Sequence, residues 1–387
     1  MRIAHVITRL ILGGAQENTL LSCEDLMRMY GDEVLLVTGP PLGPEGSLLE
    51  RARAGGVPVE LISALRRSIH PWRDFLAYRG ILRALGRFRP DVVHTHSAKA
   101  GILGRLAAKR LRVPAVVHGV HGAPFHPYQG AAARFFFRAC ERAAAPWCHA
   151  YVSVADAMTD LMVQAGVAPR HKFTTIYSGM EVEPLLDAQQ HRDRVRAELG
   201  YGPGHVVIGK VARLFHLKGH EYVIRAARQV VDAQPHARFL LVGDGILKDR
   251  LRDQIAAAGL EGHFHLAGLV PPERVAELIA AMDIVVHASL REGLARVLPQ
   301  ALIAGKPAVS YDVDGAREVV ISGETGFLVP PKSVDELADA LKRLVVDAPL
   351  RERLGAEGRR RFADRFCHRR MTGQLHALYE RLLAKPL

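Results

Sequence analysis

Short runs of β-branched and aliphatic residues alternate with longer amphipathic stretches along the whole chain of 387 residues. Such alternation is typical of parallel α/β folds, in which a helix follows each strand. The strands predicted for the first half are 2–7, 33–38, 57–62, 91–95, 114–118, 150–154 and 173–177. Those predicted for the second half are 206–212, 238–242, 263–267, 283–287, 307–311 and 326–329. Runs such as VVIGKVA and RFLLVG are apolar on both faces, which predicts sheets covered by helices on both sides.

The segment between the two sets of strands is polar and ends in a Gly/Pro cluster, which predicts a domain boundary near 180–204. We expect a first domain at 1–180 and a second at 181–365. The last segment, 366–387, has a helical pattern and is expected to pack back on the first domain. The predicted fold class is α/β, with two doubly wound Rossmann-like domains. In this arrangement a ligand is expected where the carboxyl ends of both sheets face a common crevice.

The composition is that of a soluble globular protein, with 49% hydrophobic and 24% charged residues. No apolar run approaches the roughly 20 residues that span a bilayer. The apolar start of the chain is interrupted by His5, Thr8 and Arg9, so we interpret it as a first strand and turn rather than a signal peptide. The four cysteines have no metal-ligand spacing, which favours free thiols in a reducing cytoplasm.

The formal charge of +12 is concentrated in the first half, where residues 1–180 carry 22 Lys and Arg against 13 Asp and Glu. A basic surface indicates an anionic partner: nucleic acid, a phosphorylated acceptor or an acidic membrane. Aromatic residues make up only 6% of the chain, and no basic module rich in stacking residues is present, which argues against nucleic acid. The segment RFFFRACERAAAPW at 134–147 is compatible either with an amphipathic helix on the inner face of the cell membrane or with a core-packed helix.

Two places combine a strand end with a group that attracts anions. Gly13 and Gly14 follow the first strand and precede a helix, so backbone N–H groups can approach an anion there; the alternative is a simple tight turn. Arg213 and Lys218 follow a buried strand and lie beside the start of another helix. Two cations in this position suit a diphosphate, which Arg can hold with two parallel hydrogen bonds. The alternative is a pair of solvated surface charges.

The most informative stretch is 288–331. Glu292 and Gly293 are expected in a loop directly after the strand DIVVHAS, at the entrance of a helix that carries Gln300 two turns along. This spacing allows the two side chains to reach different ends of one extended ligand. The alternative for Glu292 is that its negative charge only stabilises the positive end of the following helix dipole.

Together these segments resemble the retaining glycosyltransferases of family 4, which have the GT-B fold. The resemblance covers essentially the whole chain. It rests on GGAQENT near the start, VVHGVHG at 116–122, Arg213 with Lys218-Gly219, VGDG at 242–245, and EGLARVLPQALIAGKP. In the family the last of these motifs carries two glutamates with seven residues between them. Here Glu292 is the first, and Gln300 stands where the second belongs.

The resemblance implies a transfer on one face of the sugar, in which the leaving diphosphate accepts the proton of the acceptor. Catalysis then depends on charge stabilisation and positioning. The implied catalytic residues are Arg213, Lys218, Glu292 and His121. The implied donor-binding residues are Gly13, Gly14, Gly243, Leu269, Val270, Gly293, Leu294 and Gln300. Arg213 and Lys218 would stabilise the diphosphate, Glu292 would hold a sugar hydroxyl, Gln300 would contact the ribose, and backbone groups near Leu269 and Val270 would contact the base.

The resemblance gives His121 a contact with the transferred sugar or the reacting centre, although a structural histidine at a strand end is the alternative. His94 and His96, in HTHSAKAG, are interpreted as structural or acceptor-side residues. UDP is favoured as the nucleotide by its frequency in the family. The acceptor is expected to be a glycan or a lipid-linked intermediate, and no cofactor is expected because the nucleotide sugar is a substrate.

No Asp-x-Asp motif suited to a metal–diphosphate complex is present, since Asp312 and Asp314 follow a late strand. We therefore predict no catalytic metal, with protein cations in its place. Three other functions are compatible with parts of the pattern: a nucleotide-sugar epimerase of the same fold, a basic nucleic-acid-binding protein, and a nicotinamide dehydrogenase. The family motif argues against the first, and the G-x-G-x-x-G fingerprint of the last is missing.

Overall fold

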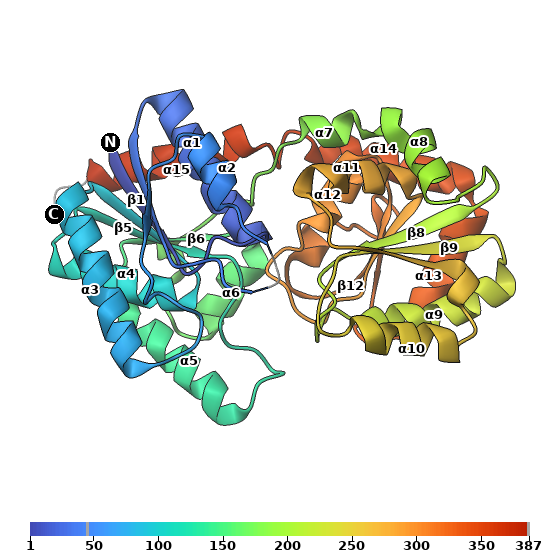
Figure 1. The fold of residues 1–387 in the computed structure, drawn as a ribbon, viewed down its shortest axis with the longest axis horizontal. Helices are drawn as coiled ribbons and strands as arrows, with labels where there is room; N and C mark the ends of the chain where they lie inside the picture. Colours follow the sequence, from blue (N-terminus) through green and yellow to red (C-terminus); the bar gives the residue numbers. More distant parts are fainter. Residues whose placement is uncertain (44–45, 385–387) are drawn as a thin grey trace. The chain divides into compact units, whose positions relative to one another are not determined.

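The computed structural model describes residues 1–43 and 46–384. The chain divides into two compact units, one formed by Met1–Met180 with the segment that starts at Phe366, and the other by Glu181–Arg365. All thirteen strands expected from the sequence are present, with ends that differ by at most two residues. Each unit contains its own sheet with helices on both faces (Figure 1).

The first unit contains a parallel sheet with the order β3-β2-β1-β4-β5-β6-β7. Its strands are β1 (Arg2–Ile7), β2 (Glu33–Thr38), β3 (Val59–Leu61), β4 (Val92–His96), β5 (Ala115–Val120), β6 (Ala150–Ser153) and β7 (Phe173–Thr175). Its helices are α1 (Gly14–Tyr30), α2 (Leu49–Ala54), α3 (Pro71–Phe88), α4 (Ala98–Arg110), α5 (Ala131–Ala144), α6 (Asp156–Gln164) and α15 (His368–Leu383), with 3-10 turns η1 (Ala145–Trp147) and η2 (Arg170–Lys172).

Alternation along β1 divides the core of this unit into two layers. Ile3 and Ile7 pack in the cluster that includes residues of α1 and α15. Ala4 and Val6 pack in the cluster formed with α3 and α4. Successive strand residues point to opposite faces, so helices on both sides bury every position of the strand after Arg2.

The last helix, α15, belongs to the first unit and packs beside α1 (Figure 1). It is attached where the first unit ends: Met180 donates its N–H to the carbonyl of Phe366, and His368 donates its N–H back to Met180. The buried carboxylate of Asp25 on α1 contacts His368 Nδ1 at 2.7 Å and accepts a hydrogen bond from Thr372 at 2.9 Å. These contacts explain why a segment so late in the chain is part of the first unit.

The second unit contains a parallel sheet with the order β10-β9-β8-β11-β12-β13. Its strands are β8 (Val206–Val211), β9 (Ala237–Val242), β10 (Phe264–Gly268), β11 (Ile284–His287), β12 (Ala308–Tyr311) and β13 (Gly326–Val329). Its helices are α7 (Glu183–Leu186), α8 (Arg192–Glu198), α9 (His220–Ala233), α10 (Lys248–Ala257), α11 (Pro272–Ala281), α12 (Val297–Ile303), α13 (Val334–Val346) and α14 (Ala348–Phe362), with 3-10 turns η3 (Ala188–His191), η4 (Glu261–His263) and η5 (Asp314–Glu318).

In both sheets the strand order reverses beside the first strand of the unit. In the first unit the change lies between β1 and β4, and in the second between β8 and β11. In open α/β sheets, ligands bind outside the carboxyl ends of the strands at such a switch point. None of the helices in the described residues has both the length and the apolar character that crossing a bilayer requires.

Candidate functional site

Four predicted site residues of the second unit, two catalytic and two donor-binding, follow neighbouring strands at their carboxyl ends. Arg213 follows β8, Gly243 follows β9, Leu269 follows β10 and Glu292 follows β11. Because these strands are adjacent and parallel, the four residues lie along one edge of the sheet, across its switch point. The structure thus brings together residues that the sequence spreads over 80 positions.

The loop that carries Lys218 is held in an unusual backbone conformation. Leu217 has φ 65° and Gly219 has φ 68°, both in the left-handed region. A Cβ atom on Gly219 would lie 1.8 Å from the carbonyl oxygen of Ala288, so only glycine fits there. Leu290 donates its N–H to Leu217 at 2.8 Å. The loop after β8 is therefore fixed against the loop after β11, and strain of this kind often marks a functional site.

Lys218 and Glu292 meet across these two loops. Lys218 Nζ lies 2.5 Å from Glu292 Oε1, and His287 Nε2 lies 3.2 Å from the same oxygen. Burial by itself raises the pKa of Glu292, but the charge of Lys218 and the hydrogen bond from His287 outweigh it and hold that pKa well below its usual value. Glu292 is therefore an anion over the whole neutral range, and it can accept further hydrogen bonds from a ligand hydroxyl.

Arg213 is exposed at the end of β8, with its guanidinium 5.0 Å from the ring centre of Phe215. Its carbonyl oxygen accepts a hydrogen bond from His220 Nε2 at 3.0 Å, which anchors its backbone to the first residue of α9. The guanidinium is thus supported by an aromatic face on a fixed backbone. This position suits a bidentate grip on an anion outside the strand ends.

Asp314 supports the Glu292 loop from the next strand. Its Oδ2 accepts the backbone N–H of Glu292 at 2.7 Å, and Gly315 donates its N–H to the carbonyl of Gly293 at 3.0 Å. Burial raises the pKa of Asp314 above its usual value. Asp312 instead forms an exposed ion pair of 3.0 Å with Arg317. The two carboxylates of the YDVDG segment therefore have different partners.

Gly243 and Gly245 let the end of β9 approach the end of β8. Gly243 has φ 134°, and a Cβ atom there would lie 2.2 Å from the carbonyl oxygen of Ala212. A Cβ on Gly245 would lie 2.5 Å from the carbonyl oxygen of Leu214. The VGDG motif thus shapes the backbone around Arg213. Leu269 is exposed beyond the end of β10, with Val270 half-buried beside it.

The loop expected at Glu292 and Gly293 is present, but the helix that follows it begins later than expected. Residues 288–296 form a loop, and α12 begins only at Val297, so Gln300 lies near the start of the helix rather than two turns along it. Gly293 and Leu294 are buried within the loop, while Gln300 is half-buried. The hydrogen bonds from Asp314 and Gly315 explain the difference, because they hold the loop to η5 in an irregular conformation.

Sequence reasoning missed Lys210, which lies near the carboxyl end of β8 and is fully buried. Its ammonium has no hydrogen-bond partner among the described residues. Burial and the charge of Lys218 lower its pKa to about 7, while Glu292 and Glu221 oppose this. The prediction that VVIGKVA is apolar on both faces is wrong at Lys210, which is charged and buried. In the sequence, a single lysine among aliphatic residues gives no sign of whether its side chain is buried or exposed.

The first unit has its own group of polar side chains at the β1/β4 switch point. Ser97, the residue immediately before α4, has φ 62°, and its Oγ lies 2.8 Å from Thr8 Oγ1 after β1. Thr8 Oγ1 also accepts the N–H of Ala100 at 3.2 Å. Gly13 precedes α1 in extended conformation and provides no side chain to cap that helix. The first turn of α1 and the strained Ser97 thus both lie at the carboxyl edge of this sheet.

His121 follows β5 and is part of a chain of imidazoles. His121 Nε2 lies 2.9 Å from His96 Nδ1, and His96 Nε2 lies 3.0 Å from His5 Nδ1. Burial lowers the pKa of His5 to about 3 and lowers the pKa of His96 well below its usual value. Neutral imidazoles each have one donor and one acceptor, so the chain fixes the ring of His121 through its neighbours.

Gly119 makes room for this chain, because a Cβ atom there would lie within 3.2 Å of nitrogen atoms of His94, His96 and His121. His94 Nδ1 contacts the buried hydroxyl of Tyr379 on α15 at 2.6 Å. Ring nitrogens of His5, His94 and His96 lie within 4.8 Å of one another, a separation that could hold a metal ion. The sequence prediction did not include His5, since only the parallel register places it beside His94.

Comparison with known proteins gives matches over most of the chain. The family model "Glycosyl transferases group 1" matches residues 191–361, and the model "Glycosyl transferase 4-like domain" matches residues 13–179. The chain is 28% identical to UDP-Gal:alpha-D-GlcNAc-diphosphoundecaprenol alpha-1,3-galactosyltransferase of Escherichia coli, over 90% of this chain and 89% of that one. It is also 28% identical to a GDP-mannose-dependent alpha-mannosyltransferase of Mycobacterium tuberculosis, over 85% of this chain and 83% of the other.

Among solved structures, Anabaena Alr3699/HepE in complex with UDP-glucose is similar in fold. The TM-score is 0.82 with 22% sequence identity, over 98% of this chain and 100% of that one. At this identity the likeness concerns the fold alone.

Proposed function

Since the chain belongs to the group 1 glycosyltransferases and has the GT-B fold of two parallel-sheet Rossmann-like domains, we propose that it transfers a sugar from a UDP-sugar, with retention of configuration, to a lipid-linked glycan intermediate. Its use of a nucleotide sugar in glycan synthesis follows from the family. The observation that carries the proposed transfer site is the contact of Lys218 with Glu292 at the carboxyl edge of the second sheet, where Arg213 also lies.

The proposed mechanism depends on charge placed near a leaving group. Arg213 and Lys218 stabilise the negative charge that develops on the diphosphate as the glycosidic bond breaks. Glu292 holds a hydroxyl of the donor sugar, and its orientation is fixed by His287 and by the N–H that it donates to Asp314. The diphosphate accepts the proton of the acceptor hydroxyl on the same face, so no carboxylate nucleophile is needed.

The remaining donor contacts are proposed along the same edge. Gln300 binds the ribose, the backbone around Leu269 and Val270 binds the base, and Gly243, Gly293 and Leu294 shape the backbone of the site. In the first domain, Gly13 and Gly14 place the start of α1 at the strand ends, and we assign them to the diphosphate. His121, oriented by His96, is assigned to the reacting centre. No cofactor and no catalytic metal take part in this mechanism.

UDP as the nucleotide is supported by two similar proteins, one named for UDP-Gal and one solved with UDP-glucose. The name of the Escherichia coli relative also gives its acceptor as a diphosphoundecaprenol-linked sugar. A polyprenyl-linked acceptor of this kind would bring the protein to the inner face of the cell membrane as a peripheral cytoplasmic protein.

Exposed aromatic side chains on the first domain support this location. Phe135 and Phe136 on α5 are 74% and 51% exposed, and Trp72 at the start of α3 is 64% exposed. These phenylalanines do not pack in a core, as the alternative for the 134–147 segment would require, since the buried residues of α5 are Glu141 and Ala144. Glu141 anchors the helix through a fully buried ion pair of 2.8 Å with Arg105. Exposed aromatic groups on a basic domain are typical of membrane-surface helices.

The decisive experiment incubates the purified protein with UDP-glucose, UDP-galactose, UDP-N-acetylglucosamine and GDP-mannose, each with and without a polyprenyl-diphosphate-linked sugar. We expect acceptor-dependent release of UDP and a product whose new bond has the anomeric configuration of the donor by NMR. Turnover of GDP-mannose but of none of the UDP-sugars would overturn the UDP proposal. A product with the inverted anomeric configuration would overturn retention. Interconversion of nucleotide sugars without acceptor would support an epimerase instead.

A further inference from the structure

A polar cavity lies wholly within the second unit, at the opposite edge of its sheet from Glu292. Asp283 immediately precedes β11, and Lys306 and Pro307 precede β12, so the cavity lies at the amino ends of these strands. Its volume is about 420 Å³, within the range of small-molecule sites. The charged residues that line it are Arg192, Asp283, Lys306, Arg351, Glu352 and Arg359.

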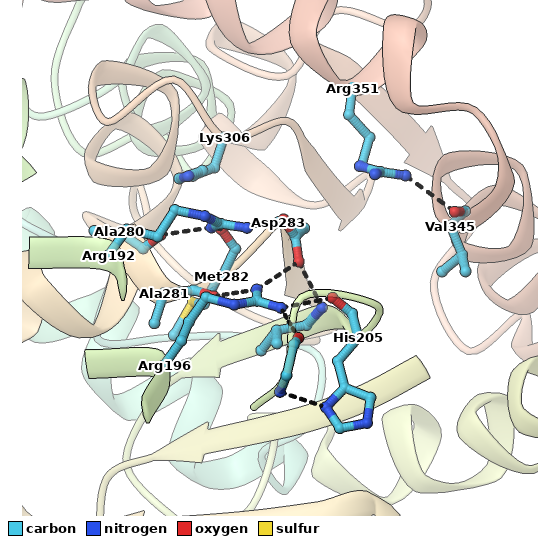
Figure 2. A network of polar contacts seen from close by, with 12 residues as sticks. Arg192, Arg196, His205, Ala280, Ala281, Met282, Asp283, Lys306, Val345 and Arg351 are labelled. Carbon is cyan, nitrogen blue, oxygen red and sulfur yellow. Dashed lines mark hydrogen bonds and ion pairs between the residues drawn. The ribbon is translucent and has the colours of Figure 1, made fainter. Parts of the chain in front are cut away.

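The charge of Asp283 is already balanced by arginines. Its Oδ1 lies 2.5 Å from Arg192 Nη2, and its Oδ2 lies 3.1 Å from Arg196 Nη1 and accepts the N–H of Val207 at 2.7 Å. Figure 2 shows both guanidinium groups directed at this one carboxylate. Burial raises the pKa of Asp283, but Arg192 and the other donors outweigh it and lower that pKa below its usual value. The single charge of Asp283 is therefore shared between its two arginine partners and the nearby Lys306, whose pKa it raises without offsetting burial.

Lys306 is only 8% exposed, and the oxygen within reach of its ammonium is the neutral Gln189 Oε1 at 3.2 Å. No carboxylate in the described residues forms an ion pair with it. Burial and the nearby Arg192 lower its pKa to about 8. Lys306 is thus a cation at neutral pH that forms no ion pair of its own among the described residues, and an anionic ligand would relieve the cost of burying it.

The other two arginines are held in place by backbone carbonyls. Arg359 donates from Nε to Ile303 at 3.0 Å and from Nη2 to Leu186 at 2.6 Å. Arg351 donates from Nη1 to Leu344 and Val345 at 2.6 and 3.0 Å. A guanidinium has five N–H donors, so each keeps donors for a ligand while its position is fixed. The remaining carboxylate in the lining, Glu352, is exposed to solvent.

From this geometry we propose that the cavity binds a phosphate group, as inorganic phosphate or as a small phosphate monoester, through Lys306, Arg351 and Arg359. Phosphate is the anion best matched to a fixed pair of guanidinium groups with a lysine point charge. The cavity is several times larger than a phosphate ion, so the ester of a small polyol also fits. This site is separate from the proposed donor site, because the two lie at opposite ends of β11.

The test is a calorimetric titration with inorganic phosphate, and separately with glycerol phosphate, at fixed ionic strength in sodium chloride. No nucleotide is added, because UDP itself ends in a phosphate group that the cavity could bind; the Lys218→Gln variant controls for the donor site. We expect saturable binding of phosphate. Lys306→Gln should weaken its affinity at least tenfold, and Lys306→Arg should weaken it less. Tighter binding of glycerol phosphate than of phosphate would identify a monoester as the ligand, and equal binding would identify inorganic phosphate.

Two further variants separate this site from general effects. Arg252→Gln removes an exposed cation of the same unit and should leave phosphate binding unchanged. Lys218→Gln should also leave it unchanged, since Lys218 lies at the other edge of the sheet. The proposal is overturned if phosphate binds no better than chloride. It is equally overturned if binding survives in a folded Lys306→Gln protein, or is lost in Lys218→Gln.

Discussion

The ammonium of Lys218 lies 2.5 Å from Oε1 of Glu292, although the two residues are 74 positions apart in the chain. The sequence assigns them to different parts of a donor, the diphosphate and the sugar. The contact means that each sets the charge environment of the other, because Lys218 contributes to the lowered pKa of Glu292. Removing one side chain therefore changes the second as well, and their mutational effects are not independent.

Lys218→Ala and Arg213→Ala should each lower kcat/KM by roughly 30- to 1000-fold, since a charged hydrogen bond to a leaving group contributes about 2–4 kcal/mol. The Lys218→Ala, Glu292→Gln double variant should lose less than the product of the two single losses. Steady-state kinetics on folded proteins measures this. Lys342→Ala, which removes a comparable pair with Asp339 on α13, is the control and should have normal activity. Near-normal turnover of a folded Lys218→Ala protein would remove Lys218 from the site.

The edge of the second sheet could be predicted from the sequence because its residues follow strands that aliphatic runs mark clearly. Arg213 and Glu292 each come directly after such a run, and parallel strands place their carboxyl ends together. What the sequence did not reveal are contacts made across the sheet by register. His5 meets His94 and His96 only because β1 and β4 pair in parallel with His5 opposite His94.

Two other features were missed for local reasons. Lys210 lies within an aliphatic run, where nothing in the pattern distinguishes a buried charge from an exposed one. The start of α12 was placed too early, because hydrogen bonds from the distant Asp314 and Gly315 hold the Glu292 loop out of helical conformation. Local propensity cannot predict a tertiary contact of this kind.

Lys210→Met should stabilise the protein, most strongly near or below pH 7. The pKa of Lys210 is lowered from 10.5 to about 7 in the folded protein, so the unfolded chain binds more protons between these values. The cost of the buried amine is therefore full below pH 7 and declines as pH rises toward 10.5. We expect a gain of roughly 3–5 kcal/mol at pH 6.5 that shrinks steadily up to pH 10.

Urea denaturation at pH 6.5, 8.5 and 10 measures this gain. Lys342→Met, at a partly exposed position on α13, should show no gain that depends on pH. A Lys210→Met protein that is less stable at pH 6.5 would indicate that the amine has a favourable partner in solution.

Activity should survive excess EDTA, because the proposed mechanism places Arg213 and Lys218 where other enzymes use a metal. Asp312→Asn should be tolerated, since Asp312 forms only an exposed pair with Arg317. Asp314→Asn should lower activity, because Asp314 accepts the N–H of Glu292 and positions that residue. Complete loss of activity in EDTA, restored by Mg²⁺ or Mn²⁺, would contradict the mechanism. Metal analysis of the purified protein would show separately whether the His5, His94 and His96 cluster holds an ion.

The protein should float with anionic liposomes at low salt and dissociate at high salt, since charge screening weakens attraction to acidic lipids. Phe135→Ser with Phe136→Ser should reduce binding severalfold while leaving the fold intact, because both side chains are largely exposed. Val346→Ser replaces a 66% exposed apolar residue of the second domain and serves as the control. Absence of binding at low salt would end the membrane hypothesis, and equal loss in the control would mean that α5 is not the contact.

Gln300 occupies the position where the family has a glutamate, near the start of α12. A carboxylate there would accept hydrogen bonds from both ribose hydroxyls, whereas a glutamine accepts through its carbonyl and donates through its amide. Gln300→Ala should raise the donor KM by roughly 5- to 150-fold, equivalent to about 1–3 kcal/mol, because the ribose hydroxyls lose their partner. Gln300→Glu should retain activity and bind the donor at least as well.

Glu292→Gln provides the matched comparison, since it exchanges the same pair of functional groups in the loop that precedes α12. Its effect should appear mainly in kcat, because Glu292 is proposed to hold the reacting sugar, and it should exceed the effect of either Gln300 variant. If donor affinity is unchanged in Gln300→Ala, α12 does not bind ribose. If Gln300→Glu abolishes activity in a folded protein, this position has a role that the family's glutamate does not have. The site around α12 would then have to be reassigned from its own contacts rather than from the resemblance.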